Sequence, residues 1–188
     1  MPYPTHITLD SILNQARTMI ELDGLESLSL NVLAEALGVK TPSLYRYVEG
    51  RAGLLRALNL QTIHQLVAAT QASHDAMSDP LDRFICMMHQ YRAYALANPM
   101  GYTLAFASAA PDSRPDPALL EALAIPLQQE MAKISGIDES LMALRGAWAL
   151  VHGYVLLEIH GQFQRGGDLE ATFERVVRGY LQGWLPAT

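Results

Sequence analysis

Residues 28–58 constrain the fold most, because they contain two short helical patterns separated by a glycine. They read LSLNVLAEALGVKTPSLYRYVEGRAGLLRAL. Ser29 is a suitable N-cap for a helix over Leu30–Leu37, and Gly38 ends it. Thr41 is expected to cap a second short helix with Pro42 at its first position, where the missing N–H costs nothing. The pattern predicts a helix-turn-helix, whose second helix enters the major groove of DNA. Its expected buried residues are Leu33, Ala34, Leu37, Val39 and Leu44.

The side chains expected to face outward from this motif suit contact with DNA. A helix start offers free N–H groups and small polar side chains to phosphates and base edges. For the two tyrosines, the alternative is that their rings pack onto the following long helix. The candidate DNA-contacting residues are Ser29, Lys40, Thr41, Pro42, Ser43, Tyr45, Arg46 and Tyr47.

Positive charge is concentrated around this motif, although the chain has a net charge of −6. Residues 38–56 contain one acidic side chain, Glu49, and four basic ones: Lys40, Arg46, Arg51 and Arg56. The remaining chain has 9 basic and 18 acidic residues. A small basic surface on an acidic protein favours DNA binding while limiting non-specific adsorption.

The rest of the chain shows helical periodicity and lacks alternating β-branched runs, so we predict an all-α protein of about nine helices. PDSRPDP, at 111–117, is the one clear loop, and Pro126 is expected to bend the helix that contains it. Besides the two short helices, we expect helices over residues 8–22, 51–77, 81–97, 102–109, 117–134 and 139–164, and a last amphipathic helix from Leu169 to Trp184.

Residues 28–58 resemble the N-terminal domain of TetR/AcrR-type transcriptional regulators, the tetracycline-repressor-like family, across all 31 positions. In that family the Leu-Tyr-x-His/Tyr segment faces DNA, and here it reads LYRY, so Tyr45 and Tyr47 are expected to contact DNA. LRGAWALVHG, at 144–153, and ANPMGY, at 97–102, resemble the WHG-type C-terminal domain of one branch.

The resemblance implies two domains: a three-helix bundle with the helix-turn-helix at 1–50, and a larger ligand-binding and dimerisation domain at 51–188. Two features depart from the family pattern. MPYPTHIT replaces the basic residues that often precede the first helix, and residues 1–50 have three basic and six acidic side chains.

A methionine- and aromatic-rich set in the middle helices predicts an adaptable apolar pocket. Trp148 and His152 lie one turn apart and could add apolar area and one polar contact. The alternative is that all of these residues form an ordinary core. His89 and Arg92 are further candidates for polar contacts. The candidate ligand-binding residues are His64, Met87, Met88, Tyr91, Tyr94, Tyr102, Phe106, Trp148 and His152.

The family resemblance also implies a homodimer formed through the last two helices. Gly146 and Gly153 lie seven residues apart on one helical face, which suggests close approach of a helix from the same chain or from a partner. A two-fold dimer would place its recognition helices one DNA turn apart on a palindromic operator. We therefore expect a DNA-binding regulator, most simply a repressor released by a small apolar or aromatic effector.

No pattern in the chain indicates an enzyme, a metal site or a cofactor. A Gly-rich phosphate loop and a Gly-x-Ser-x-Gly elbow are both missing, and His152 and His160 have the wrong spacing for a zinc protease. Cys86 is the single cysteine, no signal peptide is evident, and no apolar run reaches about 18 residues, so we expect a cytoplasmic protein without membrane contact. The alternative function is an α-helical ligand-binding or hydrolytic protein that does not read DNA.

Overall fold

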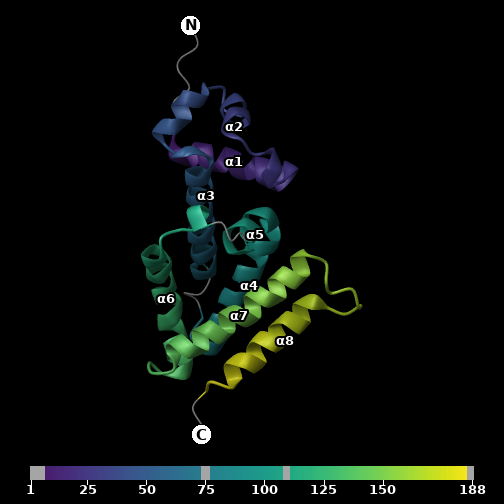
Figure 1. Cartoon of the computed structure of the whole chain (residues 1–188). Coiled ribbons are helices and arrows are strands. Elements are labelled where there is room, and N and C mark those ends of the chain that lie inside the picture. The colour runs from purple at the N-terminus through teal and green to yellow at the C-terminus, as the bar shows by residue number, and fades with distance from the viewer. Residues whose placement is uncertain (1–6, 73–76, 108–110, 186–188) are drawn as a thin grey trace. The chain divides into compact units, whose positions relative to one another are not determined.

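A computed structural model of the chain describes residues 7–72, 77–107 and 111–185. These residues form α-helices and short 3₁₀-helices but no strand, which confirms the all-α prediction (Figure 1). The helix expected at Thr41 is the 3₁₀-helix η2. With the eight α-helices it makes the nine helices that were predicted, counted over the described residues, and two shorter 3₁₀-helices, η1 and η3, were not predicted. The elements are α1 (Leu9–Asp23), η1 (Leu25–Ser27), α2 (Leu30–Ala36), η2 (Thr41–Arg46), α3 (Gly50–Gln71), α4 (Pro80–Ala97), α5 (Pro99–Ala107), η3 (Pro111–Ser113), α6 (Pro117–Ser135), α7 (Ser140–Ile159) and α8 (Leu169–Gln182).

Two helix ends differ from the sequence prediction for local reasons. α5 begins at Pro99 rather than residue 102, because a proline costs nothing in the first helical turn. α7 ends at Ile159 instead of Gln164, because Gly161 has a φ of 63° and the Gln162 N–H turns back to Leu157 O at 2.8 Å. The predicted extensions of α3 towards residue 77 and of α5 to residue 109, and the N-terminal MPYPTH stretch, involve residues 73–76, 108–110 and 1–6, which lie outside the described residues.

The contacts divide the chain into two compact units, which we describe separately. Unit 1 comprises residues 1–64 and 98–116, and unit 2 comprises residues 65–97 and 117–188. Unit 1 therefore includes α5 and η3 in addition to the N-terminal helices. The functional boundary expected after residue 50 remains a prediction.

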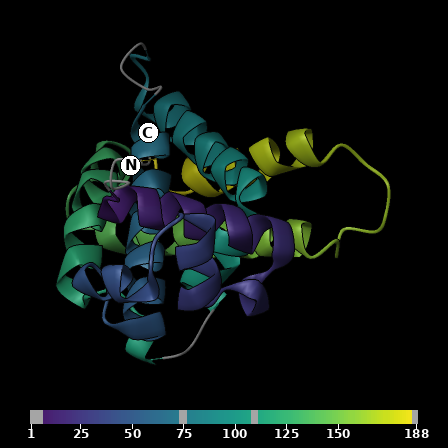
Figure 2. The same ribbon diagram turned by 90° about the horizontal axis from the view of Figure 1, so that it is seen from above.

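Unit 1 has one apolar core that fixes the helix-turn-helix against α1 and α3. Side chains from α1, α2 and η2 pack together, with Leu54 and Leu58 from α3 and Leu104 from α5. Figure 2 shows the ribbons of the N-terminal helices of this unit from above. Among the fully buried members are Ile12, Leu33 and Leu44. Leu33, Ala34 and Leu44 are buried as predicted, while Leu37 and Val39 pack against the core with partial exposure.

Hydrogen bonds to the α5–η3 segment explain why it groups with unit 1. The Glu21 carboxylate accepts from the backbone N–H of Gly101 at 2.7 Å and of Met100 at 3.1 Å, so it caps the start of α5. Arg56 donates twice to Asp112 O, and Asn59 donates to Ser113 O at 2.8 Å. α1 and α3 thus hold both ends of this segment.

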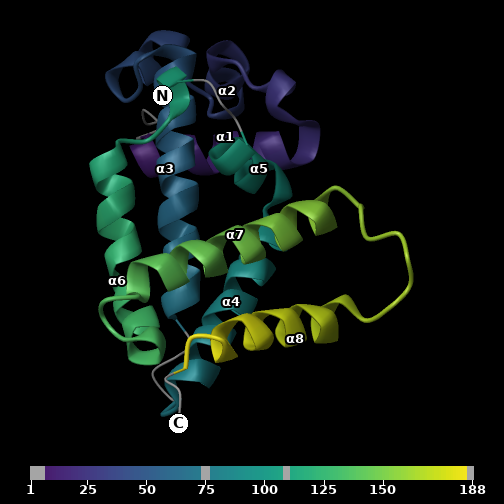
Figure 3. The same cartoon turned by 60° about the horizontal axis from the view of Figure 1, so that its bottom comes forward.

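Unit 2 is built on α4, α6, α7 and α8. α7 and α8 run antiparallel beside each other, joined by residues 160–168 (Figures 1 and 3). Its fully buried side chains include Phe84, Met87, Met131 and Phe173. By length and composition alone, α7 could span a membrane, although the sequence analysis had found no apolar run of this length. Of the most apolar 18-residue segment of α7, 33% is buried in the protein. A core helix of a soluble protein passes the same test, so this finding is weak evidence for a membrane segment.

The two glycines that we expected to permit close helix approach differ in their surroundings. A Cβ atom on Gly146 would lie 2.0 Å from Tyr180 Oη and 2.8 Å from Tyr180 Cζ. That hydroxyl donates to Ala143 O at 2.8 Å, so α8 of the same chain occupies the space over Gly146. A Cβ atom on Gly153 would meet nothing within 4 Å.

We therefore predict opposite effects of alanine at the two positions. Gly146→Ala should lower the free energy of unfolding by about 1–3 kcal/mol, because the half-buried Tyr180 ring must move and its hydrogen bond is lost. Gly153→Ala, the matched control, should leave stability unchanged or raise it by up to ~1 kcal/mol, the gain in helix propensity. Urea denaturation of both variants measures this difference, and equal effects would contradict the packing of Tyr180 over Gly146.

Candidate nucleic-acid interface and ligand-binding helices

The turn between α2 and η2 is defined by local hydrogen bonds. Ser29 Oγ accepts from the Val32 N–H at 3.2 Å and caps α2. After α2, Gly38 adopts a φ of 67°, in the left-handed region, and the Val39 N–H donates to Ala34 O at 2.9 Å. η2 then begins with Pro42 in its first turn, and the fully buried Leu44 anchors it. The predicted pair of short helices is confirmed, and the second is a 3₁₀-helix. The prediction that Thr41 caps it is wrong: Lys40 is the N-cap residue, no side chain caps the helix, and Thr41 rather than Pro42 is its first residue, because the Thr41 hydroxyl is bonded to Asn31 instead.

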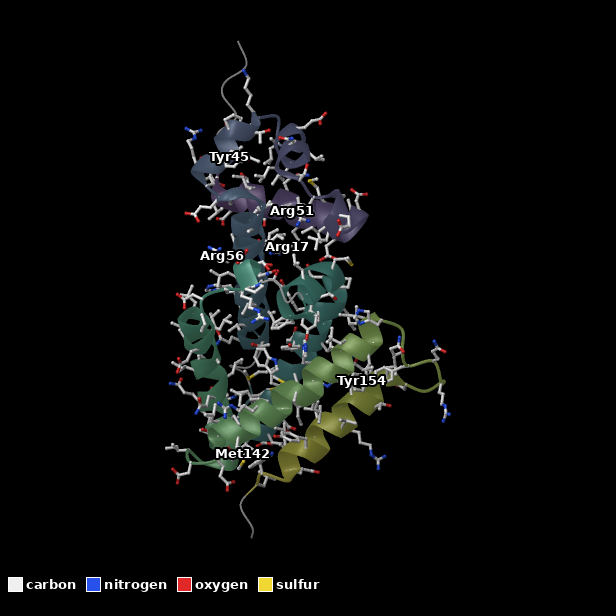
Figure 4. The ribbon with its side chains drawn as sticks, viewed as in Figure 1. Arg17, Tyr45, Arg51, Arg56, Met142 and Tyr154 are labelled. Atoms are coloured by element: carbon white, nitrogen blue, oxygen red, sulfur yellow. The ribbon has the colours of Figure 1, made fainter. Side chains whose placement is uncertain are left out.

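Four of the candidate DNA-contacting residues are exposed on η2 or immediately before it: Lys40, Pro42, Tyr45 and Arg46. Tyr45 exposes 60% of its surface, so its ring and hydroxyl are accessible to a partner (Figure 4). Lys40 and Arg46 form no side-chain hydrogen bond or ion pair with the part of the chain that the structure describes. Their charges are therefore available to an anionic partner.

Thr41 and Ser43 are half-buried beside this exposed set. The Thr41 hydroxyl donates to Asn31 Oδ1 at 2.9 Å, so α2 fixes its orientation. Sequence analysis missed Asn31, although its place near the capped start of α2 is a feature that could have identified it. An exposed amide at this position can offer its own N–H donors to phosphate.

Two other candidates are engaged within the protein. The Tyr47 hydroxyl donates to Ile7 O at 2.8 Å, and its ring packs against the core of unit 1. The alternative predicted for Tyr47 was packing onto the following long helix. Its ring does pack within unit 1, but its hydroxyl bonds to the residue that precedes the α1 cap. The Ser29 hydroxyl caps α2. Contact of either residue with DNA remains a prediction, and each hydroxyl oxygen already has a hydrogen-bond partner within the protein.

Of the four basic residues counted near the motif, two bind backbone carbonyls. Arg51 donates to Leu28 O and Leu25 O, both at 3.2 Å, and so ties the start of α3 to the segment before α2. Arg56 donates to Asp112 O, as described above. Both labelled side chains belong to α3 in Figure 4. The basic surface free to meet DNA is therefore smaller than the sequence count and centres on Lys40 and Arg46.

The nine candidate ligand-binding residues are divided between the two units. His64, Tyr102 and Phe106 belong to unit 1, where His64 is exposed and the fully buried Tyr102 ring lies 4.8 Å from that of Phe106. The other six belong to unit 2.

Within unit 2, α4 and α7 bring two of the predicted aromatic residues together. The Tyr91 and Trp148 rings meet edge to face, with centroids 5.8 Å apart. Met87, Met88 and Tyr91 are buried in the core, and the Tyr94 hydroxyl donates to Gln65 Oε1 at 3.1 Å. Ligand binding by this set remains a prediction.

His152, one turn after Trp148, is half-buried, and desolvation lowers its pKa from the ordinary value of 6.5. The unfolded chain therefore takes up this proton at a higher pH than the folded chain does. We predict that the contribution of His152 to the free energy of unfolding is constant above about pH 6.5 and is lost as the pH decreases through the folded pKa. Denaturation between about pH 8 and pH 5 measures the change, and His152→Gln should flatten it, whereas the exposed His160→Gln should not. An equally steep curve for His152→Gln would contradict the assignment.

Arg92, which sequence analysis considered as a polar ligand contact, is instead the centre of a buried ion cluster. Its guanidinium donates to both Glu158 oxygens at 2.6 and 2.7 Å and also to Glu170, and it lies 5.3 Å from the Phe173 ring centroid. His89 contacts Glu170 at 2.8 Å. The hydrogen bonds with Glu158 raise the pKa of Arg92 further above its usual range. The cluster joins α4, α7 and α8. In the described residues, no three His, Cys, Asp or Glu side chains are placed to hold a metal ion.

Comparison with known proteins adds two family matches that together span most of the chain. The family described as "Bacterial regulatory proteins, tetR family" matches residues 12–58. The family described as "Tetracyclin repressor-like, C-terminal domain" matches residues 84–180, which include the Trp148–Gly153 pattern. An HTH-type transcriptional regulator of Mycobacterium tuberculosis is 32% identical over 184 residues, covering 93% of this chain and 80% of the relative.

Solved structures share the same fold. A protein of unknown function from Rhodococcus sp. RHA1 superposes with a TM-score of 0.82 at 23% identity, covering 99% of this chain and 100% of that chain. A TetR variant from Acinetobacter baumannii AYE, in complex with minocycline, superposes with a TM-score of 0.69 at 20% identity, covering 95% and 96% of the two chains. The family match at residues 12–58 and the relative from Mycobacterium tuberculosis are to transcriptional regulators, so they give no support to the alternative function considered above.

Proposed function

Because this chain belongs to the TetR family of bacterial transcriptional regulators, whose members bind DNA and are not enzymes, we propose that η2 and the residue before it contact an operator. The observation that supports this proposal is the exposed set Lys40, Tyr45 and Arg46 on a short helix anchored by Leu44. Lys40 and Arg46 supply charge to phosphates, Arg46 also suits a guanine edge, and Tyr45 offers a ring and a hydroxyl. An operator-binding role places the protein in the cytoplasm.

Asn31 and the remaining candidates have supporting roles in this proposal. Asn31 accepts the Thr41 hydroxyl proton through Oδ1 and keeps its own amide N–H donors for the DNA backbone, to which the Ser43 hydroxyl can also donate. Ser29 and Tyr47 position η2 through the α2 cap and the bond to Ile7. Pro42 contributes the fixed backbone of the first turn.

In vitro selection from a random duplex pool tests DNA reading and identifies the operator sequence in the same experiment. The full chain should enrich one near-palindromic sequence with half-sites about 10 base pairs apart. A Lys40→Ala/Tyr45→Ala/Arg46→Ala variant should enrich none. Failure of the wild-type chain to enrich any sequence would reject the proposal.

We further propose a homodimer formed by the outward face of α7 and α8. Three apolar side chains on this face are exposed, Met142, Leu157 and Val176, and a Cβ atom on Gly179 would meet nothing within 4 Å. Apolar side chains beside small residues let two helices pack closely against two others. Pairing of this face would also account for the exposed apolar surface of α7 (Met142, near its start, is labelled in Figure 4).

Sedimentation tests this interface. The wild-type chain should sediment as a dimer, and Leu157→Glu/Val176→Glu should shift it to monomer while retaining helical content. Ile137→Glu, at an apolar side chain exposed in the α6–α7 turn, is the matched control and should remain dimeric. A dimer unaffected by the double variant would place the interface elsewhere.

We propose that the protein acts as a repressor and that unit 2 binds a small apolar or aromatic effector that releases it. The related TetR variant from Acinetobacter baumannii AYE binds minocycline in its solved complex, and here the half-buried Trp148 ring, which packs on the buried Tyr91, offers aromatic surface. In a purified transcription reaction, the selected duplex placed across a promoter should make the chain inhibitory. Stimulated transcription would contradict the repressor assignment.

A further inference from the structure

We propose that the groove between α6 and α7 binds an amphiphilic anion, with its apolar part against Trp148 and its anionic group on Arg145. The inference rests on the effector response proposed above, and it specifies both a site and a ligand class. The groove lies wholly within unit 2. Its lining residues are Ala124, Leu141, Leu144, Arg145, Trp148 and Ala149.

The size and the lining of this groove suit an apolar group. Its volume is about 320 Å³, at the lower end of the range for small-molecule pockets. Leu141, Leu144 and Trp148 supply apolar walls, and Ala124 and Ala149 leave room between the helices. An aliphatic chain or a single aromatic ring buried here would gain stability from the apolar area that it removes from water.

Arg145 is the one charged residue in this lining, and its charge is not neutralised within the described residues. The side chain is exposed and forms no hydrogen bond or ion pair there. Three other arginines of unit 2 bind carboxylates: Arg83 pairs with Glu130, Arg92 with Glu158, and Arg178 with Asp82. A guanidinium beside an apolar groove favours a carboxylate that can accept two parallel hydrogen bonds.

Trp148 connects the groove to the core of unit 2. It lines the groove and also meets the buried Tyr91 ring of α4 edge to face. A ligand that moves the indole therefore displaces Tyr91 or loses that contact, because the packed core around Tyr91 leaves little free space. A ligand bound in the groove can therefore change the packing of α4 through the contact between Trp148 and Tyr91.

A second copy of the chain is the competing occupant, since Leu141, Arg145 and Ala149 are also exposed on α7. Binding of an anion and burial in a dimer make different predictions for Arg145. If the groove binds an anion, the charge of Arg145 is needed for affinity for that anion. If the groove is instead buried between two copies of the chain, the same charge is needed for dimer formation.

Octanoate and 1-octanol are suitable probes, because they share an alkyl chain and differ in the carboxylate. The chain has two tryptophans, so Trp184→Phe leaves Trp148 as the only indole. In this background, octanoate should change Trp148 fluorescence saturably and bind about tenfold more tightly than 1-octanol, as expected for one charge-assisted interaction. Arg145→Gln should abolish this preference, while Arg165→Gln, the same charge change in the exposed α7–α8 loop, should preserve it. Sedimentation should be identical for all variants.

Three results would overturn the proposal. They are no saturable change in Trp148 fluorescence, equal affinity for octanoate and 1-octanol in the protein that retains Arg145, and dissociation of a dimer by Arg145→Gln. Binding of the same proteins to the selected duplex distinguishes this failure from failure of the proposed function. Loss of the octanoate response with intact duplex binding rejects the groove alone. A protein that selects no duplex fails as a regulator whatever its response to octanoate.

Discussion

Lys40→Ala/Arg46→Ala is expected to bind the selected duplex at least about 100-fold more weakly than the wild-type chain at physiological salt. A dimer presents each side chain twice, so the double variant removes four positive groups from the DNA surface. If all four contact phosphates, the slope of log K against log salt should become less steep by roughly 3 to 4. Fluorescence anisotropy at several salt concentrations measures both quantities.

Lys133→Ala/Arg165→Ala is the matched control, because it makes the same change in net charge on unit 2. Lys133, whose side chain is 45% exposed, pairs with Glu130 three residues earlier, and Glu130 keeps Arg83 as a second partner, so loss of Lys133 should cost little stability. The control should retain wild-type affinity and salt slope. Equal losses in the two double variants would attribute binding to net charge and not to the η2 surface.

Arg92→Gln is expected to lower the free energy of unfolding by about 3 kcal/mol, the low end of the cost of removing one partner from a buried ion pair. Glu158 is 13% exposed and would keep an uncompensated charge near the core, which accounts for most of the loss. The Glu170 side chain is 63% exposed, so water can solvate this carboxylate once Arg92 is removed, and its loss of the ion pair costs little. Urea denaturation at neutral pH measures the effect.

Two further variants make this prediction specific. Arg178→Gln breaks exposed pairs with Asp82 and Glu174 and should cost no more than about 1 kcal/mol. Adding Glu158→Gln to Arg92→Gln should recover part of the loss, because it removes the unpaired carboxylate. Equal costs for Arg92→Gln and Arg178→Gln would show that the Arg92 cluster is effectively solvated.

Features set by neighbouring residues could be predicted from the sequence. Ser29, Gly38 and Pro42 act through hydrogen bonds and backbone angles within a few positions, so α2 and η2 were located correctly. The buried Leu33 and Leu44 followed from helical spacing. The family assignment followed from the same stretch.

Features that depend on distant parts of the chain could not be predicted. The Tyr47 hydroxyl binds Ile7, 40 residues away, and Arg92 binds Glu158, 66 residues away. Helical spacing places Gly146 and Gly153 on the same face of α7. Only the position of α8 shows that Tyr180 fills the space over Gly146, while the space over Gly153 is empty. Similarly, Glu21 caps a helix that begins 78 positions later, so the grouping of α5 with unit 1 required the three-dimensional structure.

Hydrogen–deuterium exchange with and without the selected duplex tests the central claim most directly, since it locates the bound surface without substituting any residue. The account predicts slower exchange in peptides that cover residues 29–47, around α2 and η2, while the α6 peptides exchange at an unchanged rate. Protection in α6 or α8 with none in residues 29–47 would contradict the assignment of this segment as the DNA-contacting surface.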